Sequence, residues 1–109
     1  MTAYAVVDAR TSNGVRCVRI CGEVDLTNAT NVREAISRLA SPDAPVIIVD
    51  LTDTTYLDSS AIAMLFHLAE RLTQRRQKLH IVVPPNSPLR AALELTALPH
   101  TIPLQPTLE

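Results

Sequence analysis

Residues 46–60 read VIIVDLTDTTYLDSS, and the predicted fold class follows from this stretch. Its first four residues, Val46 to Val49, form an unbroken β-branched run, which is typical of a central strand buried on both faces. Residues 50–57 are expected to lead out of that strand as a loop. A long helix is then expected from about Ser59 to Arg76. The stretch therefore predicts a strand that leads through a loop into a helix, which indicates an α/β protein.

The segments before this stretch predict a hairpin and a first helix. Strands are expected at residues 5–8 and 15–21, and they flank an Asn-Gly turn at residues 12–14, which is the strongest short signal for a hairpin. Residues 22–26 are expected to leave the sheet. Thr27 is the expected N-cap of a helix whose apolar residues follow at helical spacing.

The segments after this stretch predict one more strand and a short helix. The strand is expected at residues 79–83, and Ser87 is the expected cap of the helix, with proline at its first position. The tail holds Ile102 and Leu104 between prolines and is a candidate edge strand. The structured core is therefore expected to end with the short helix.

The order of these elements defines the fold class. Strands that are joined through helices must run parallel, with right-handed crossovers. We therefore predict a single α/β domain over residues 1–109, with a core at about 5–98 and a short proline-containing C-terminal tail. Its mixed sheet would have four to five strands, an N-terminal β-hairpin, and amphipathic helices packed on it.

The composition argues against several classes of function. The 109 residues are 47% hydrophobic, so the chain can bury a core, and its formal net charge of −1 argues against a general nucleic-acid binder. Three aromatic residues and two glycines are too few for base stacking, a Walker loop or a dinucleotide fingerprint. Since no apolar run reaches roughly 18 residues, we expect a cytoplasmic protein with no membrane insertion and no direct nucleic-acid contact.

The cysteines and histidines predict neither a disulfide nor a metal site. Cys17 and Cys21 share a predicted strand, which places them roughly 13 Å apart, whereas a disulfide needs Cα atoms within about 7 Å. The chain has no C-x-x-C pair, and its three histidines are scattered. We expect two half-buried thiols, no metal and no cofactor.

Polar residues gather in two loops that follow strands. Sites in open α/β sheets form outside the carboxyl ends of the strands, and the loops at residues 22–27 and 54–60 fit that rule. The second loop holds Asp58, Ser59 and Ser60 before the long helix, where unpaired backbone N–H groups favour negative charge. The plainest interpretation is that Asp58 or Ser59 is the N-cap of that helix.

Catalysis by these residues is not predicted. Ser59 would need a base, and His67, the nearest histidine in the sequence, would lie about 12 Å further along the helix axis. Asp25 and Asp58 could form a carboxylate pair across the two loops, but no apolar pocket accompanies them. We therefore expect no catalytic residues and no enzyme.

Ser59 is better suited to phosphorylation than to catalysis. A phosphate adds about −1.5 to −2 charges, which the start of a helix tolerates. The neighbouring carboxylates of Asp58 and Asp25, and a partner surface matched to them, would not tolerate that charge. Phosphorylation of Ser59 is therefore expected to change binding rather than folding.

The long helix is apolar over more than its core face. Ala61, Met64 and Leu68 widen its apolar arc to about 200°, well beyond the stripe of about 100° that a surface helix needs. Either a further layer of the domain, such as the last helix, covers these residues, or they form an exposed patch for a partner. The sequence leaves both alternatives open.

Three segments resemble the STAS-domain family: residues 22–25 (GEVD), 46–51 (VIIVDL) and 56–60 (YLDSS). The order of elements also resembles the family from about Ala5 to Leu98. The similarity is greatest to the small, stand-alone bacterial anti-sigma factor antagonists. The family pattern is Asp-Ser-Ser/Thr-Gly, and Ala61 stands where that pattern has glycine.

This resemblance implies a regulatory binding protein. In the family, the unphosphorylated antagonist binds an anti-sigma factor that is also a serine kinase, and the sigma factor is released. The kinase phosphorylates the serine after the aspartate, which corresponds to Ser59, and a phosphatase resets the cycle. The implied switch loop and partner surface comprise Asp25, Asp58, Ser60, Ala61, Met64 and Leu68.

A second interpretation from the same resemblance is an accessory subunit of a membrane transporter, such as an ABC-type lipid transport system. In such a system the domain docks on an ATPase and needs no phosphorylation. Alanine at position 61 favours this alternative, and the proteins that co-purify with the chain would distinguish the two.

Overall fold

The structure is a computed structural model that describes residues 4–12 and 14–108. Along the chain, its elements are β1 (Ala5–Ser12), β2 (Val15–Val24), α1 (Ala29–Leu39), β3 (Val46–Asp50), β4 (Thr54–Leu57), α2 (Ser59–Gln74), β5 (Lys78–Val82), α3 (Pro88–Glu94), α4 (Leu98–Thr101) and β6 (Leu104–Gln105). Asn13 of the predicted hairpin turn lies outside the described residues. The hairpin itself is confirmed, because β1 and β2 pair antiparallel along their length.

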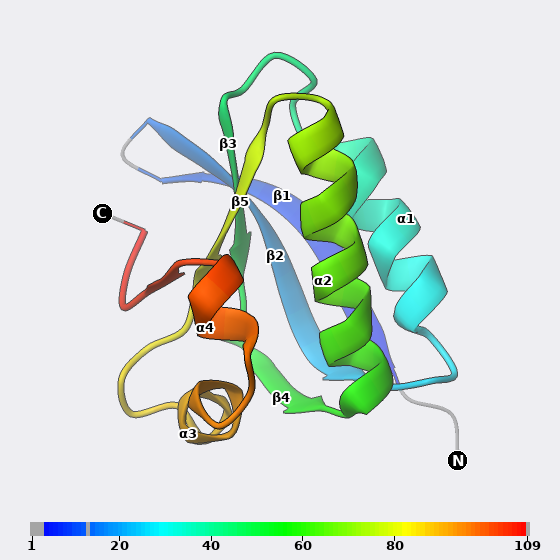
Figure 1. Cartoon of the computed structure of the whole chain (residues 1–109), viewed down its shortest axis with the longest axis vertical. Coiled ribbons are helices and arrows are strands. Elements are labelled where there is room, and N and C mark those ends of the chain that lie inside the picture. The colour runs from blue at the N-terminus through cyan, green and yellow to red at the C-terminus, as the bar shows by residue number, and fades with distance from the viewer. Residues whose placement is uncertain (1–3, 13, 109) are drawn as a thin grey trace.

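A mixed sheet forms the centre of the fold (Figure 1). Its strands follow the order β1-β2-β3-β5-β6, and β4 pairs with the end of β2. The hairpin pair is antiparallel and the other pairs are parallel, as crossover connections require. The predicted α/β class, with an N-terminal hairpin and helices packed on a mixed sheet, is therefore confirmed.

The sheet has six strands rather than four or five, because β4 lies in the segment 50–57 that was predicted to be a loop. The prediction that the chain leaves the sheet at Gly22 is also wrong, since β2 continues to Val24. The two differences have one cause. The last residues of β2 remain in the sheet because β4 pairs with them in parallel, with Val24 opposite Leu57.

Gly22 allows β2 to continue through an irregularity in this pairing. The register with β4 shifts between Gly22 and Glu23, and Gly22 has a φ of +106°. A Cβ at this position would lie 2.4 Å from the carbonyl oxygen of Tyr4. Only glycine therefore fits where β2 bends toward the loop that follows it.

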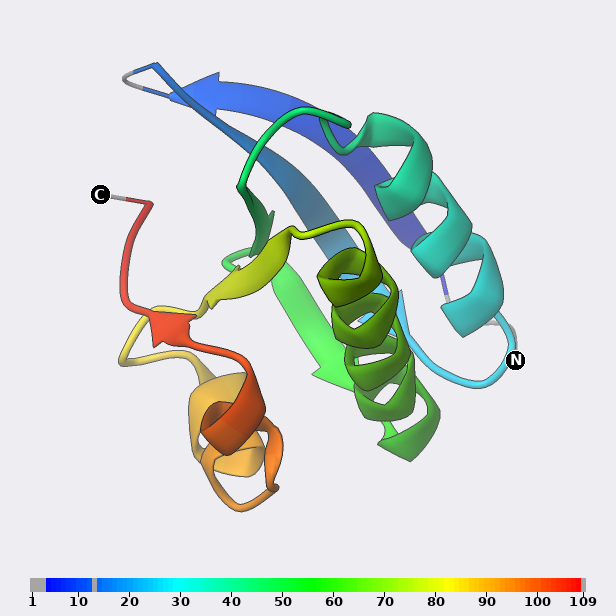
Figure 2. The same ribbon diagram turned by 45° about the horizontal axis from the view of Figure 1, so that its top comes forward.

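α1 and α2 lie side by side on one face of the sheet (Figures 1 and 2), and the core lies between them and the strands. Val32 and Ile36 of α1 and Leu65 of α2 pack there with the sheet residues Ile20 and Val49. α3 packs against α4 and β4, and these two short helices lie away from the α1–α2 pair.

The apolar arc of α2 is covered rather than exposed. Ala61, Met64 and Leu68 have relative exposures of 0%, 4% and 1% and belong to the core. Met64 and Leu68 lie against α1, so the cover comes from within the domain, from α1 rather than from the last helix. The alternative of an exposed partner patch on this arc is therefore wrong for the chain on its own.

α2 ends at Gln74, two residues before the predicted end at Arg76. Arg76 adopts a φ of +61°, and its amide donates to the Thr73 carbonyl at 3.0 Å. The Gln77 amide donates to the Leu72 carbonyl at 2.8 Å. These two bonds form a Schellman motif, in which Arg76 occupies the left-handed position that glycine usually fills.

The side chain of Gln77 then ties this turn to the segment before β3. It is buried, and its Nε2 donates to the carbonyls of Ser41 at 2.9 Å and Ala44 at 2.7 Å. The turn after α2 and the turn after α1 are thereby held together at the same end of the molecule.

The C-terminal segment belongs to the core. Leu98 and Ile102 are fully buried, so the core continues past the expected limit at residue 98. The predicted edge strand is confirmed as β6, which pairs with β5. The predicted Ser87 cap is confirmed as well, because its Oγ accepts a hydrogen bond from the Leu89 amide at 3.2 Å.

Both cysteines are free thiols. Cys21 is half-buried as expected, whereas Cys17 is fully buried, and this burial raises the pKa of the Cys17 thiol.

Among the helices of residues 4–12 and 14–108, none combines the length and apolar character that a bilayer crossing demands.

Candidate functional site

The two loops singled out in the sequence meet at one end of the sheet. Because β2 and β4 are parallel neighbours, Asp25 and Asp58 follow directly after the paired residues Val24 and Leu57. The backbone of the second loop is tied to the first, since the Asp58 amide donates to the Val24 carbonyl at 3.3 Å. The structure thus brings the two predicted acidic residues to the same edge.

The Asp58 carboxylate connects α2 to the β2–α1 loop. Its Oδ1 accepts from the Ala61 amide at 2.9 Å, which makes Asp58 the N-cap of α2. Its Oδ2 accepts from the Leu26 amide at 3.1 Å. The capping interpretation of Asp58 is therefore confirmed, and the second bond is one that the sequence did not predict.

The Asp25 carboxylate organises the β2–α1 loop. Its Oδ1 accepts from the Thr27 amide at 2.8 Å and from the Thr27 hydroxyl at 2.6 Å. These bonds, the hydroxyl first, hold the pKa of Asp25 below its usual value. Asp25 therefore remains a charged group facing the edge where Asp58 lies.

The predicted N-cap of α1 is wrong. The N-cap position of α1 is Asn28, one residue after the expected Thr27, and the Thr27 hydroxyl donates to the Asp25 carboxylate. The Asn28 side chain turns back toward the loop, where its Oδ1 accepts from the Asp25 amide and its Nδ2 donates to the Glu23 carbonyl, each at 2.9 Å. The loop is therefore braced from within by its own polar side chains.

Ser59 is exposed at the first position of α2, and Ser60 beside it is half-buried. In this first turn, the amides of Ala61 and Ile62 donate to Asp58. The amides of Ser59 and Ser60 have no acceptor within residues 4–12 and 14–108, as is normal at the start of a helix. The Ser59 hydroxyl is therefore accessible in a setting that favours an added negative charge.

Two exposed apolar side chains near these loops were missed in the sequence. Leu26 is 78% exposed and directly follows Asp25, and Tyr56 is 50% exposed on β4. The signal for Leu26 was an apolar residue inside an otherwise acidic and polar turn. Tyr56 gave no signal, because its strand was predicted to be a loop.

A hollow of about 230 Å³ lies next to Ser60, between α1 and α2. Leu26, Arg33 and His67 are among the residues that line it. The Arg33 Nε is buried and has no hydrogen-bond partner in the described part of the chain. The surface beside Ser59 therefore combines carboxylates, an arginine and exposed apolar side chains.

Comparison with known proteins places this geometry in a family. A family model described as the STAS domain matches residues 6–109. The chain is 31% identical over 62 residues to the anti-sigma-F factor antagonist RsfB of Mycobacterium tuberculosis, a match that covers 57% of this chain and 51% of that protein. It is 30% identical over 60 residues to the anti-sigma-B factor antagonist of Listeria monocytogenes, covering 55% and 53%. The chain spans about half the length of the curated relatives it matches.

Solved structures share the fold. The crystal structure of an anti-sigma factor antagonist from Mycobacterium paratuberculosis matches with a TM-score of 0.79 and 26% identity, covering 99% of this chain and 92% of that one. The unphosphorylated anti-sigma factor antagonist SpoIIAA matches with a TM-score of 0.65 at 15% identity, covering 91% and 87%, which is a likeness of fold. With a family model matched from residue 6 to residue 109, the chain belongs to the STAS domain family.

Proposed function

We propose that this chain is an anti-sigma factor antagonist that is switched by phosphorylation of Ser59. The unphosphorylated chain binds an anti-sigma factor that is also a serine kinase, and the sigma factor is released. The observation that carries the proposal is the exposed Ser59 at the start of α2, directly after the Asp58 carboxylate that joins the two loops. The names of the relatives support the same role.

The partner would contact the edge formed by the two loops. Leu26 and Tyr56 offer exposed apolar area there, while Asp25 and Asp58 supply negative charge. Apolar side chains surrounded by charged groups are typical of a protein-binding surface. Met64 and Leu68 are buried in the chain on its own, so Leu26 and Tyr56 take their place in the proposed contact surface.

Phosphorylation would end binding without unfolding the chain. A phosphate on Ser59 adds about −1.5 to −2 charges at a helix start that accepts anions, so the fold tolerates it. The phosphate lies beside two carboxylates and adds bulk and charge at the contact surface, so a partner surface matched to the unmodified edge would no longer fit it. A phosphatase would then restore the binding form.

The alanine at position 61 is compatible with this switch. The family pattern has glycine here, and a methyl group on the surface would hinder an approaching kinase. Ala61 is fully buried, however, so its methyl group points into the core and leaves the side of the helix that carries Ser59 unobstructed.

The test is to incubate the chain with candidate anti-sigma kinases and ATP, and to analyse the peptide that spans Ser59 by mass spectrometry. We expect one phosphate on Ser59, none in Ser59→Ala, and normal labelling in the control Ser41→Ala, which changes a serine in the turn after α1. A phosphate found only on Thr52, Thr54 or Thr55 would refute the assignment.

A binding assay completes the test. Ser59→Asp is expected to lose capture of the anti-sigma factor while its free energy of unfolding changes by less than about 0.5 kcal/mol, since the site is exposed. Ser59→Ala should bind and stay bound in the presence of ATP. If pull-downs recover a transporter ATPase and neither a kinase nor a sigma factor, the transporter-subunit alternative replaces this proposal.

A further inference from the structure

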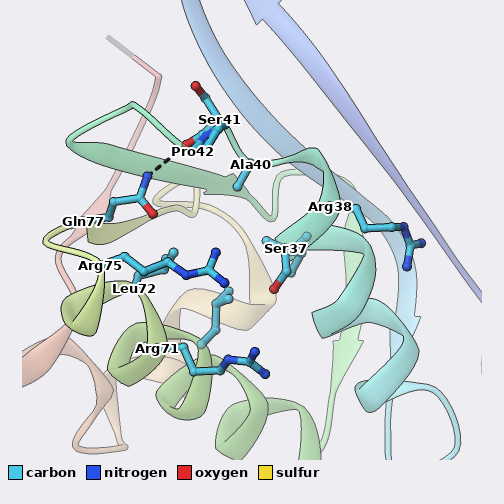
Figure 3. A pocket seen from close by; sticks show the side chains of 11 residues that line it. Ser37, Arg38, Ala40, Ser41, Pro42, Arg71, Leu72, Arg75 and Gln77 are labelled. Atoms are coloured by element: carbon cyan, nitrogen blue, oxygen red, sulfur yellow. Dashed lines mark hydrogen bonds between the residues drawn. The ribbon is translucent and has the colours of Figure 1, made fainter.

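A second polar hollow lies at the opposite end of the α1–α2 pair from Ser59 (Figure 3). We call it the distal groove. It has a volume of about 190 Å³ and lies between the last turns of the two helices. Ser37 lines it from α1, Arg71 and Arg75 line it from α2, and buried Leu68 and Leu72 lie beneath them. Of these residues, only the buried Leu68 is among those that the family resemblance implied for the partner surface.

Arg71 and Arg75 place two like charges in this groove. They are four residues apart on α2, so they share one face of the helix, and Figure 3 shows both side chains projecting toward α1 and Ser37. The ion pairs of residues 4–12 and 14–108 are Arg19 with Asp8, Arg19 with Asp53, and Arg90 with Glu94. Neither groove arginine therefore has a carboxylate partner, and the pair is mutually repulsive.

The helix ends account for only part of this positive charge. Each helix C-terminus carries roughly half a negative charge, so the two ends together supply about one. Arg71 and Arg75 alone carry twice that amount. Arg38, on the last turn of α1, adds a further charge at the rim, although Figure 3 shows its side chain pointing away from the groove. The charged side chains that line the groove are therefore all positive.

We propose that the distal groove binds a phosphate-type oxyanion, held by the guanidinium groups of Arg71 and Arg75 and by the Ser37 hydroxyl. Guanidinium groups match the geometry of phosphate oxygens and form strong charge-assisted hydrogen bonds with them. A bound anion would also relieve the repulsion between the two arginines. The apolar floor strengthens such contacts, because it keeps water from one side of the ligand.

The binding test uses the full chain labelled with ¹⁵N. Inorganic phosphate is titrated in one series and glycerol phosphate in a second, each against potassium chloride at matched ionic strength. We expect saturable amide shifts confined to residues 36–42 and 71–77. A similar dissociation constant for both ligands would show that the free phosphate anion is sufficient for binding. Tighter binding of glycerol phosphate would show that the groove prefers a phosphoryl group carried on a small organic molecule.

Charge-removing variants distinguish a site from general screening. The double variant Arg71→Gln/Arg75→Gln is expected to weaken binding by about tenfold or more, because it removes both charged donors. The control variant Arg10→Gln, which removes an exposed arginine from the hairpin, should bind as the parent chain does. If the groove variant is poorly folded, Arg75→Lys replaces it and should bind more weakly while keeping its charge.

Three outcomes would overturn the proposal. They are shifts that chloride reproduces at equal ionic strength, shifts that follow every exposed arginine in the chain, and saturable binding that survives the Arg71/Arg75 double variant. The result is independent of the Ser59 switch, because no partner protein enters the assay.

Discussion

Asp58 shows how a single residue can serve both the fold and the site. One carboxylate oxygen caps α2 and the other holds the Leu26 amide of the opposite loop. The position of Ser59 relative to Asp25 and Leu26 therefore depends on this side chain. The acid next to Ser59 therefore contributes to the shape of this edge as well as to its charge.

We predict that Asp58→Ala lowers the free energy of unfolding by about 1–2 kcal/mol, because it removes an N-cap and leaves the Leu26 amide without its acceptor. Asp58→Asn should recover only part of this loss, since its amide oxygen can cap α2 while its NH2 group would face the Leu26 amide and cannot accept from it. Urea unfolding monitored by circular dichroism measures both. Asp43→Ala, an exposed acid in a turn, is the control, and an equal loss in that variant would contradict the capping argument.

At the scale of elements, the sequence predicted the helices and strands that have a clear hydrophobic pattern. It missed β4, which is stabilised mainly by its neighbour β2. β3 was clear from four β-branched residues in a row. β4 has one buried polar residue, Thr54, whose hydroxyl donates to the Ile20 carbonyl at 2.7 Å. β4 has only four residues and no alternating apolar pattern, and it is stabilised by its pairing with β2 and by this hydrogen bond. The sequence alone therefore does not predict it as a strand.

The turn after α2 is another feature of this scale, and it carries a prediction. Arg76 holds a left-handed backbone that costs a non-glycine residue about 1 kcal/mol or more. Arg76→Gly should therefore stabilise the chain by up to about 1 kcal/mol, measured by thermal and urea unfolding.

Arg75→Gly is the matched control for this substitution. Its φ is −97°, so there is no strain to relieve and no gain is expected. A loss of stability in Arg76→Gly would show that the arginine side chain contributes more to this turn than its backbone costs.

At the scale of the whole molecule, the sequence could place the site but could not place its surroundings. Parallel connectivity predicted that the loops with Asp25 and Asp58 would meet, and they do. The burial of Met64 could not be predicted from the sequence, because an apolar helix face has the same residue pattern whether α1 or a partner protein covers it. The burial of Ile102 in the core could not be predicted either, because an isolated apolar residue among prolines shows no periodicity.

The C-terminal segment is predicted to be essential for stability. Ile102 is fully buried in the core, so Ile102→Ala should lower the free energy of unfolding by about 2–5 kcal/mol. Leu95→Ala, at a position that is 90% exposed, should change it by less than about 0.5 kcal/mol. Equal effects of the two substitutions in urea unfolding would show that residues beyond 98 are not part of the cooperative unit.

The bond between Leu26 and Asp58 joins positions 32 residues apart in the sequence. The two loops meet only when β2 and β4 are paired, so the edge that they form belongs to the folded chain. Under the proposed function, only natively folded molecules would then bind the partner. Because about 1.4 kcal/mol changes the unfolded fraction tenfold, substitutions in the core would lower the amount of binding-competent chain only when they remove most of its stability.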